Sequence, residues 1–592
     1  MSENLAVVLA GVVTAVEVEA RRLREEFMRP EGPRGHRAKA PIDTEIEIRL
    51  LEVLQRLIDC PYLGEETGLH AGTKAEWLWL VDPHDGTKQY LEGRGGSAVS
   101  VGLLHQRIPV LGVVSCRTSP DRGFDNIAWA EGCGPVLRNG LPVSSDFSSR
   151  PLGNRDLVWF TASASRRPGV YARAAAPARY VAMASIAYRL ARVAAGDGLV
   201  AVSIHSVNEY DIAAGAALLR GAGGVLLDGS GREIVFTGAA EARVSGCFAG
   251  SREAAARLAG FDWSEVDREA RQPERLSTAF PRMADEARLA RVQGGLTGML
   301  AGASLGSLTG GRGADEVAQV WPQGVRELAD GGPWGTLAGQ PTGDAELALA
   351  LARALVRERG FDPNQALLAY RHWLASGPFE IEAGMPESLA AGSERRIERA
   401  SAGPLPRSAI IGLSSGADPQ RAAAAARKDC VLTHSSPVCV EACAALAAAV
   451  AAGVAGAPPG AISDTALAVL SGDAVAVRAA IERGQRGESP LFESGSTAAL
   501  TALQSAIQQV HHATDLEAGI VASASMGGDA ASHAALTGAL LGARYGRSAL
   551  PSRWMLALLS CRPAADADSF RPRPMDYWPD DVLELAEVLA KF

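Results

Sequence analysis

The chain has 592 residues, more than one ordinary domain contains, so two or more domains are expected. Apolar residues make up 47% of it, and the net charge of −9 comes from acidic and basic residues scattered along the chain. No basic face is available to hold a phosphate backbone, which argues against a nucleic-acid-binding protein. Eight cysteines without a Cys-x-x-Cys pair are typical of a reducing cytoplasm.

An apolar run at residues 5–16 opens the chain. No basic residue precedes it and charged residues follow at once, so residues 5–28 are expected to form an amphipathic helix rather than a signal peptide. A second apolar run, at residues 442–457, is alanine-rich and too short to predict a membrane span.

The first half of the chain mixes the patterns of strands and helices, which predicts an α/β or α+β domain over residues 1–265. The expected strands are 77–81, 98–104, 109–116 and 223–228, and the expected helices are 5–28, 44–58 and 211–221.

The second half has a different pattern. Residues 266–284 are charged and punctuated by proline, which predicts a linker. Strand patterns then almost vanish, and alanine- and leucine-rich runs predict an all-α domain over residues 285–592. The expected helices are 285–304, 344–358, 364–375, 418–428, 437–453, 464–483, 497–511 and 530–544.

The sequence VDPHDGT at residues 81–87 places two carboxylates at the end of an apolar strand. Its proline stops the strand and turns the chain, so Asp82 and Asp85 can converge with the carbonyl group of His84 between them. Three hard oxygen donors within four residues suit Mg²⁺, and free backbone N–H groups at Gly86 and Thr87 suit a phosphate. A turn followed by a helix cap explains the same residues without a ligand.

Two further segments add to this motif. GEE at 64–66 lies upstream, and YDIAAG at 210–215 with AGG at 222–224 lies downstream of DPHDGTKQY at 82–90. In order and spacing, these segments resemble the inositol monophosphatase superfamily, and within it the 3′(2′),5′-bisphosphate nucleotidase branch. The resemblance implies a layered α/β sandwich that hydrolyses phosphomonoesters.

The resemblance also implies a metal and phosphate site. Two or three Mg²⁺ ions would be bound by acidic side chains and one backbone oxygen. The implied metal ligands are Glu65, Asp82, Asp85, Asp211 and the carbonyl oxygen of His84. The N–H groups of Gly86 and Thr87 would bind the phosphate.

Catalysis in such a site is an in-line attack of water on phosphorus, in which Thr87 and Glu65 are implied to orient the water. The family also uses a carboxylate of the preceding helix, and this position falls on Glu45, with Asp43 as the alternative. The expected catalytic residues are Glu65, Thr87, Asp85 and Glu45.

Four motifs of the second half resemble, in order, the ADP-ribosylglycohydrolase family of all-α enzymes. They are the glycine-spaced run at 290–311, TGDA at 342–345, TH at 433–434 and GGDAAS at 527–532. In that family two Mg²⁺ ions hold the ribose hydroxyls of an ADP-ribosyl group. The implied site residues are Thr342, Asp344, Asp529 and Ser532.

Three carboxylates of the family's metal motifs are missing, one of them in the opening helix at residues 302–306. Asp344 and Asp529 are few ligands for a two-metal site, so it stays open whether this domain holds a metal. A domain that only binds a nucleotide or ribosyl group, a hydrolase with one metal or none, and a structural or dimerising domain are all compatible with the sequence.

A single carboxylate can stabilise the oxocarbenium-like state of glycosidic cleavage, and Asp344, Asp529 and Glu346 are the candidates. Arg407 is expected either to contact an anion or to cap a helix.

Together the halves predict a cytoplasmic Mg²⁺-dependent phosphatase for a small phosphorylated nucleotide or sugar phosphate. Its partner domain would bind or cleave an ADP-ribosyl or ribosyl-phosphate compound, so that both act in turn on one metabolite. Two alternatives remain: a phosphatase fused to an inactive nucleotide-binding or assembly module, and an ADP-ribosyl-protein hydrolase. Neither nucleic acid nor a membrane is an expected partner, and a homodimer is left open.

Overall fold

The computed structural model describes residues 4–147, 151–276, 282–490, 497–565, 569 and 571–592. It divides into two compact units, Met1–Arg282 and Met283–Phe592. The predicted linker begins as part of the first unit, because Glu269 accepts hydrogen bonds from the backbone N–H groups of Gly169 and Val170. Residues 277–281 of that linker lie outside the described residues.

Two β-sheets organise the first unit. The eight-stranded sheet has the order β2-β1-β3-β4-β5-β6-β7-β8, and a five-stranded sheet has the order β10-β9-β11-β15-β13. The first consists of β1 Tyr62–Gly64, β2 Gly68–His70, β3 Trp77–Asp85, β4 Ala98–His105, β5 Ile108–Ser119, β6 Gly123–Ala130, β7 Leu137–Arg138 and β8 Leu141–Pro142. The second consists of β9 Leu157–Thr161, β10 Arg179–Met183, β11 Val200–Ser203, β13 Val225–Leu227 and β15 Cys247–Gly250, and β12 Val207–Asn208 pairs with β14 Arg243–Val244.

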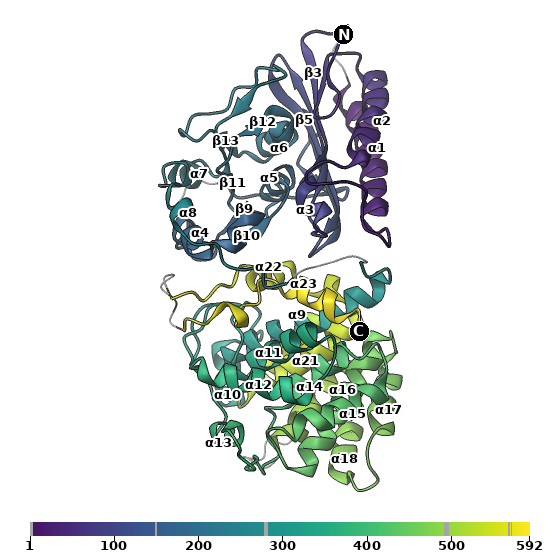
Figure 1. The fold of residues 1–592 in the computed structure, drawn as a ribbon, viewed down its shortest axis with the longest axis vertical. Helices are drawn as coiled ribbons and strands as arrows, with labels where there is room; N and C mark the ends of the chain where they lie inside the picture. The colour runs from purple at the N-terminus through teal and green to yellow at the C-terminus, as the bar shows by residue number, and fades with distance from the viewer. Residues whose placement is uncertain (1–3, 148–150, 277–281, 491–496, 566–568, 570) are drawn as a thin grey trace. The chain divides into compact units, whose positions relative to one another are not determined.

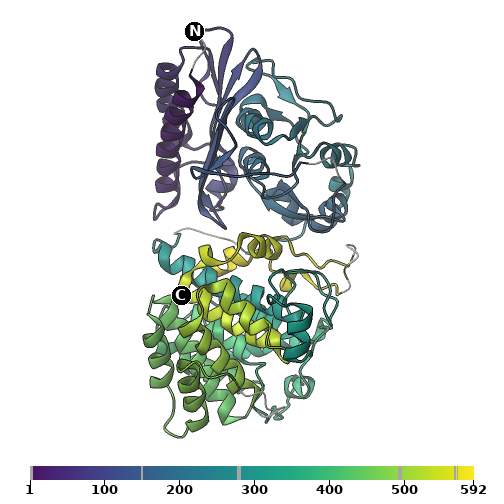
Figure 2. The ribbon, with the colours of Figure 1, turned by 180° about the vertical axis from the view of Figure 1, so that it is seen from behind.

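Helices form three layers around these sheets (Figures 1 and 2). One layer covers the outer face of the eight-stranded sheet, a second lies between the sheets, and a third covers the five-stranded sheet. The outer layer is α1 Leu5–Phe27 and α2 Pro41–Leu57, the middle layer is α5 Ile186–Ala194 and α6 Glu209–Ala222, and the last includes α4 Pro168–Ala175 and α7 Arg252–Ala259. The short helices are α3 Thr87–Leu91 and α8 Glu265–Arg268. The predicted layered α/β sandwich is confirmed.

The apolar pattern of α2 explains its place. Ile42, Ile46, Leu50 and Leu54 recur every four residues and are all buried. Residues at this spacing lie on one helical face, so α2 packs this stripe against the sheet. Asp43 and Glu47 follow Ile42 and Ile46 and are buried as well, which brings two carboxylates to the sheet.

The second unit is all-α, as predicted. Its helices are α9 Glu286–Ser307, α10 Ala314–Val320, α11 Gly343–Glu358, α12 Pro363–Ala375, α13 Met385–Leu389, α14 Leu405–Leu413, α15 Pro419–Cys430, α16 Pro437–Val454, α17 Pro459–Ala468, α18 Val475–Gln485, α19 Ala498–His512, α20 Leu516–Ala524, α21 Ala530–Tyr545, α22 Ser552–Ser560 and α23 Val582–Leu589. The single helix predicted over 464–483 is wrong, because a turn at residues 470–474 separates α17 from α18.

The glycine-spaced run lies in α9, which packs along α21 over most of its length. The backbones meet where glycine faces glycine: a Cβ atom on Gly298 would collide with the carbonyl group of Gly538, and the reverse is also true. These glycines therefore set the distance between the two central helices.

Gly298→Ala is expected to destabilise the protein by about 2–3 kcal/mol, because the added methyl group forces the two backbones apart. Gly460→Ala is the matched control, since a Cβ atom there meets nothing within 4 Å, and its expected effect is within about 1 kcal/mol. Urea unfolding of the two variants tests this, and equal stabilities would contradict the packing argument.

One helix, α16, is long and apolar enough to cross a membrane by composition alone. Of its 18-residue apolar window, 78% is buried inside the unit, which fits a core helix.

Candidate active sites

The end of β3 forms the first site. β3 lies between β1 and β4, and its pairing with β4 shifts register between Asp82 and Asp85. The shifted segment is tied back on itself, since Asp82 accepts a hydrogen bond from the backbone N–H of His84 at 2.8 Å. β1 runs parallel to β3 and continues into Glu65, whose N–H donates to the carbonyl group of Val81 at 3.2 Å. Glu65 and Asp82 therefore lie side by side.

Four acidic side chains gather here. Glu65 and Asp82 share a hydrogen bond, and Asp85 and Asp211 lie close enough for their charges to act on these groups. Burial, followed by the neighbouring carboxylates, raises the pKa of Glu65 to about 7 and that of Asp82 well above its usual range. The pKa values of Asp85 and Asp211 are also raised, chiefly by burial.

Two helix N-termini hold the outer members of this group. Asp85 accepts hydrogen bonds at 2.6 Å from the hydroxyl of Ser185 and the N–H of Ala187, at the start of α5. Asp211, in the first turn of α6, accepts one from the N–H of Asn208 at 2.7 Å. Helix N-termini favour negative charge, so these contacts fix both carboxylates in place. No sequence motif pointed to Ser185, which lies 100 residues from Asp85.

The structure brings Asp43, not Glu45, to the position beside Thr87. The hydroxyl of Thr87 lies 3.4 Å from Oδ2 of Asp43, and Asp43 is 2% exposed. Glu45 points elsewhere and pairs with Arg34 at 3.4 Å. Residues two apart on a helix face different sides, so the buried stripe of α2 could carry only one of them to the sheet.

Asp43→Asn is accordingly expected to lower kcat for phosphate-ester hydrolysis about a hundredfold, the usual size of a proton-transfer contribution. Glu45→Gln is expected to change it less than about twofold, because an exposed ion pair contributes little. Steady-state kinetics on both variants measure this. A larger loss of kcat in Glu45→Gln than in Asp43→Asn would instead support Glu45 as the catalytic carboxylate.

Glu47 is a residue that the sequence interpretation missed. It is fully buried and accepts hydrogen bonds from the N–H groups of Glu66 and Thr67 at 2.9 and 2.7 Å. These bonds hold the turn that carries Glu65. Its four-residue spacing from Asp43 on one helical face was the available signal.

The segment after Asp85 turns sharply into a short helix. Gly86 has a φ of 101°, the left-handed region that favours glycine, and precedes α3. The hydroxyl of Thr87 donates to the carbonyl oxygen of His84 at 2.8 Å. Lys88 is exposed.

The second site lies in the helical unit, where α11 and α21 begin. Thr342 precedes α11 and is buried, and Asp344 occupies the first turn. Asp529 precedes α21 and is hydrogen-bonded to Ser532. Asp344 and Asp529 are close enough for the charge of one to raise the pKa of the other.

Two glutamates missed in the sequence join them. Glu380 accepts a hydrogen bond from the N–H of Gly343 at 2.8 Å. Glu382 lies beside Asp344 over Gly403, where an added Cβ atom would collide with Glu382 and lie 3.4 Å from Oδ1 of Asp344. The helical unit thus has four carboxylates in one place rather than two.

The pKa values of these four carboxylates are shifted in different directions. Burial first, then Glu380, Glu382 and Asp529, raise the pKa of Asp344 well above its usual range, and burial raises that of Asp529 to about 6. Burial would raise the pKa of Glu382 too, but hydrogen bonds from its neighbours lower it to about 2.

Three side chains hold Glu382. Arg399 donates to it at 2.8 Å, Nε2 of His434 lies 3.2 Å from its Oε2, and Ser401 also bonds to it. His434 in turn contacts Ser401 at 2.8 Å and Thr433 at 2.9 Å. The Thr-His pair noted in the sequence therefore supports this glutamate.

Glu346 and Arg407 both have buried partners. Glu346 is fully buried against Arg573 at 2.8 Å and Trp373 at 2.9 Å, and its charge contributes to the raised pKa of Glu380. Arg407 contacts an anionic side chain, one of its two expected roles, since it is buried with Asp429 at 2.9 Å and Thr433 at 2.8 Å.

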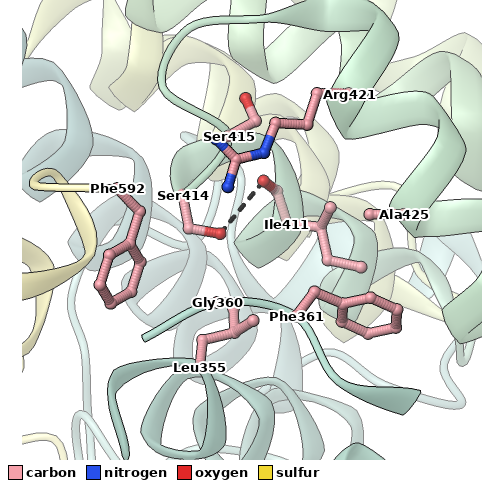
Figure 3. Close-up of a pocket in the computed structure, with 9 residues that line it drawn as sticks. All are labelled: Leu355, Gly360, Phe361, Ile411, Ser414, Ser415, Arg421, Ala425 and Phe592. Carbon is pink, nitrogen blue, oxygen red and sulfur yellow. Dashed lines mark hydrogen bonds between the residues drawn. The ribbon is translucent and has the colours of Figure 1, made fainter. Parts of the chain in front are cut away.

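A separate pocket of the helical unit, lined in part by Leu355, Phe361, Ile411 and Phe592, is too small for a metabolite (Figure 3). Its volume of 30 Å³ holds about one water molecule. It shares no residue with the acidic group.

Known proteins resemble each unit separately. The sequence profile of the inositol monophosphatase family matches residues 8–262, and that of the ADP-ribosylglycohydrolase family matches residues 284–590. A probable inositol 1-monophosphatase, ImpA of Mycobacterium tuberculosis, is 31% identical over 209 residues, covering 34% of this chain and 74% of that protein.

Two other curated proteins match the first unit. The fructose-1,6-bisphosphatase/inositol-1-monophosphatase of Aquifex aeolicus is 32% identical over 208 residues, which are 31% of this chain and 69% of that protein. The 3′(2′),5′-bisphosphate nucleotidase CysQ of Salmonella typhimurium is 38% identical over 90 residues, which are 14% of this chain and 37% of that protein.

A solved structure titled an ADP-ribosylglycohydrolase-related protein complex is 28% identical, with a TM-score of 0.43, and covers 52% of this chain and 99% of that one. Through its first unit the chain belongs to the inositol monophosphatase family of metal-dependent phosphomonoester hydrolases, and through its helical unit to the ADP-ribosylglycohydrolase family.

Proposed function

We propose that the first unit is a Mg²⁺-dependent phosphatase for a small phosphorylated nucleotide or sugar phosphate. The main observation in support is that four carboxylates from separate segments lie together beside the Thr87–Asp43 pair. They are Glu65, Asp82, Asp85 and Asp211. A bound cation would offset the repulsion among these buried carboxylates.

The donor chemistry fits Mg²⁺, since every donor is an oxygen. Within the described residues, no group of three or more His, Cys, Asp and Glu side chains is already spaced to hold an ion. Glu65, Asp82, Asp85, Asp211 and the His84 carbonyl would hold it. Bound Mg²⁺ would lower the pKa of the attacking water and offset the charge that develops on the phosphate.

The residues of the chain supply the remaining parts. Oδ2 of Asp43, acting with the hydroxyl of Thr87, would accept the proton of the attacking water. The N–H groups of Gly86 and Thr87 would bind phosphate oxygens. Glu65 would orient the water beside Thr87.

Phosphate release is the test. The purified chain is assayed with and without Mg²⁺ on about twenty phosphorylated metabolites, including inositol 1-phosphate and adenosine 3′,5′-bisphosphate. Mg²⁺-dependent release from a subset, removed by EDTA, is expected. No release from any ester with Mg²⁺ would overturn the proposal.

For the helical unit, we propose that it binds an ADP-ribosyl or ribosyl-phosphate compound and cleaves its glycosidic bond. The observation that favours this is the pairing of an ionised Glu382 with Asp344, whose pKa is raised. A carboxyl with a raised pKa suits the acid for the leaving group, and a carboxyl with a lowered pKa suits the anion for the oxocarbenium-like state. Glu380 and Glu382 also supply acidic groups that the degenerate motifs lack.

The alternatives predict different results. Calorimetric titration with ADP-ribose, AMP and NAD, together with assays for release of free base or ribose, separates them. Binding with cleavage supports the proposal. Binding without cleavage supports an inactive nucleotide-binding module, and no binding supports an assembly module. Release of ADP-ribose from modified protein alone supports an ADP-ribosyl-protein hydrolase.

The fusion suggests consecutive steps on one nucleotide-derived metabolite, since removal of phosphate and cleavage of a glycosidic bond both apply to such compounds. We place the protein in the cytoplasm, because its eight cysteines are thinly spread along the sequence without a Cys-x-x-Cys pair.

A further inference from the structure

The side chain of His84 stands inside the phosphatase motif but does not reach its surface. The ring is fully buried, and Nδ1 lies 2.6 Å from Oδ1 of Asp43, a residue 41 positions away. Tyr90 packs edge-on against the ring, with centroids 4.3 Å apart. A buried ring cannot touch a substrate, so any effect of it on catalysis must pass through Asp43.

We propose that His84 is a positioning residue of the phosphatase site, whose ring holds Asp43 in the orientation that faces Thr87. This inference rests on the proposed function of the first unit.

The hydrogen bonds of Asp43 divide between its two oxygens. Oδ1 is taken by His84, and Oδ2 faces the hydroxyl of Thr87 at 3.4 Å and accepts the N–H of Ala40 at 3.3 Å. A carboxylate held at both oxygens cannot rotate. Loss of the His84 bond would leave Oδ1 buried without that donor, and the side chain would turn to find another.

The position of the proton on the His84 ring also suits this role. Nε2 is buried and has no hydrogen-bond partner in the described part of the chain. A proton there would be an unsatisfied donor, whereas a proton on Nδ1 donates to Asp43. A proton on Nδ1 therefore satisfies both the histidine and the carboxylate.

His84 also acts through its backbone. Its carbonyl oxygen accepts the hydroxyl of Thr87 at 2.8 Å. One residue thus contacts both members of the Thr87–Asp43 pair, the carboxylate through its ring and the hydroxyl through its carbonyl group. Replacing the side chain removes only the first contact, which makes the role of the ring separable.

Three variants test the inference: His84→Leu, which removes the donor, His84→Asn, whose amide nitrogen stands near the place of Nδ1, and Asp43→Asn. Relative to the wild type, His84→Leu is expected to lower kcat about tenfold with KM nearly unchanged, and His84→Asn to recover most of the loss. The double variant His84→Leu/Asp43→Asn is expected to be no slower than Asp43→Asn, because both changes act through one carboxylate.

A kcat of His84→Leu within twofold of the wild type, or fully additive losses in the double variant, would overturn the inference. If His84→Leu does not fold, His84→Asn decides: a loss as large as that of Asp43→Asn overturns the role of the donor. A spectrum of protein labelled with ¹⁵N-histidine adds a readout independent of activity, and a missing Nδ1–H signal for His84 also overturns it. An inactive wild type with that signal present would instead overturn the proposed function.

Discussion

Asp82→Asn is expected to lower phosphate-ester hydrolysis by about a thousandfold, the scale of losing a major electrostatic contribution to the transition state. Asp82 lies at the centre of the four carboxylates, hydrogen-bonded to Glu65 and within reach of Asp85 and Asp211. An asparagine keeps the acceptor for the N–H of His84 but removes the charge that would hold a cation. Phosphate release at saturating Mg²⁺ measures the loss.

The same variant is expected to stabilise the metal-free protein. Burial and three neighbouring carboxylates raise the pKa of Asp82, so its ionisation works against the fold. Removing that charge should raise the melting temperature in EDTA at pH 8 while activity falls. Glu52→Gln, an exposed carboxylate on α2, is the control and should change neither quantity. A variant that is both inactive and less stable would contradict the electrostatic account.

The pH dependence of the metal-free protein follows from the same groups. A carboxyl whose pKa is raised on folding binds more protons in the folded than in the unfolded state, so stability falls as pH rises through the interval between the two pKa values. For Glu65 this interval runs from 4.5 to about 7. The melting temperature of the first unit in EDTA should therefore fall between pH 5 and pH 7, and added Mg²⁺ should weaken that pH dependence.

Glu382→Gln is expected to lower glycosidic cleavage by the helical unit about a hundredfold, because the substitution keeps the size of the side chain and removes its negative charge. Glu382 is the carboxylate of this site with the lowest pKa, about 2, and Arg399, Ser401 and His434 hold it. Bound substrate would lose the anion that faces its developing positive charge. Rates of base or ribose release from the substrate found by screening measure this.

Glu387→Gln is the matched control, since Glu387 is exposed on the neighbouring helix α13. If the helical unit binds ADP-ribose without cleaving it, the change in affinity is measured by calorimetry instead. Equal behaviour of Glu382→Gln and Glu387→Gln in both measurements would remove Glu382 from the site.

Much of the first unit follows from its sequence alone. The apolar runs predicted strands at 77–81, 98–104 and 109–116, and these lie in β3, β4 and β5. The motif at 81–87 and its flanking segments indicated the family because each motif is short and lies beside a regular element. Local propensity and short spacing carry this information.

Which carboxylate of α2 meets Thr87 was decided by tertiary packing. Asp43 and Glu45 have the same chemistry and lie two residues apart, so the motif could not separate them. The packing of Ile42 and Ile46 against the sheet turned Asp43 inward and left Glu45 beside Arg34. His84 and Ser185 likewise gained their partners only through contacts across 41 and 100 residues.

The helical unit shows most clearly what the sequence predicts and what only the tertiary structure decides. Its sequence determined the all-α class and the family, because periodicity and motif order are local properties. The motifs in the sequence kept only two carboxylates, Asp344 and Asp529. Folding brings two more, Glu380 and Glu382, to the same place. Sequence alone indicated the fold class and the family motifs of each unit; the tertiary structure decided which charges share a site, because that depends on packing between segments far apart along the chain.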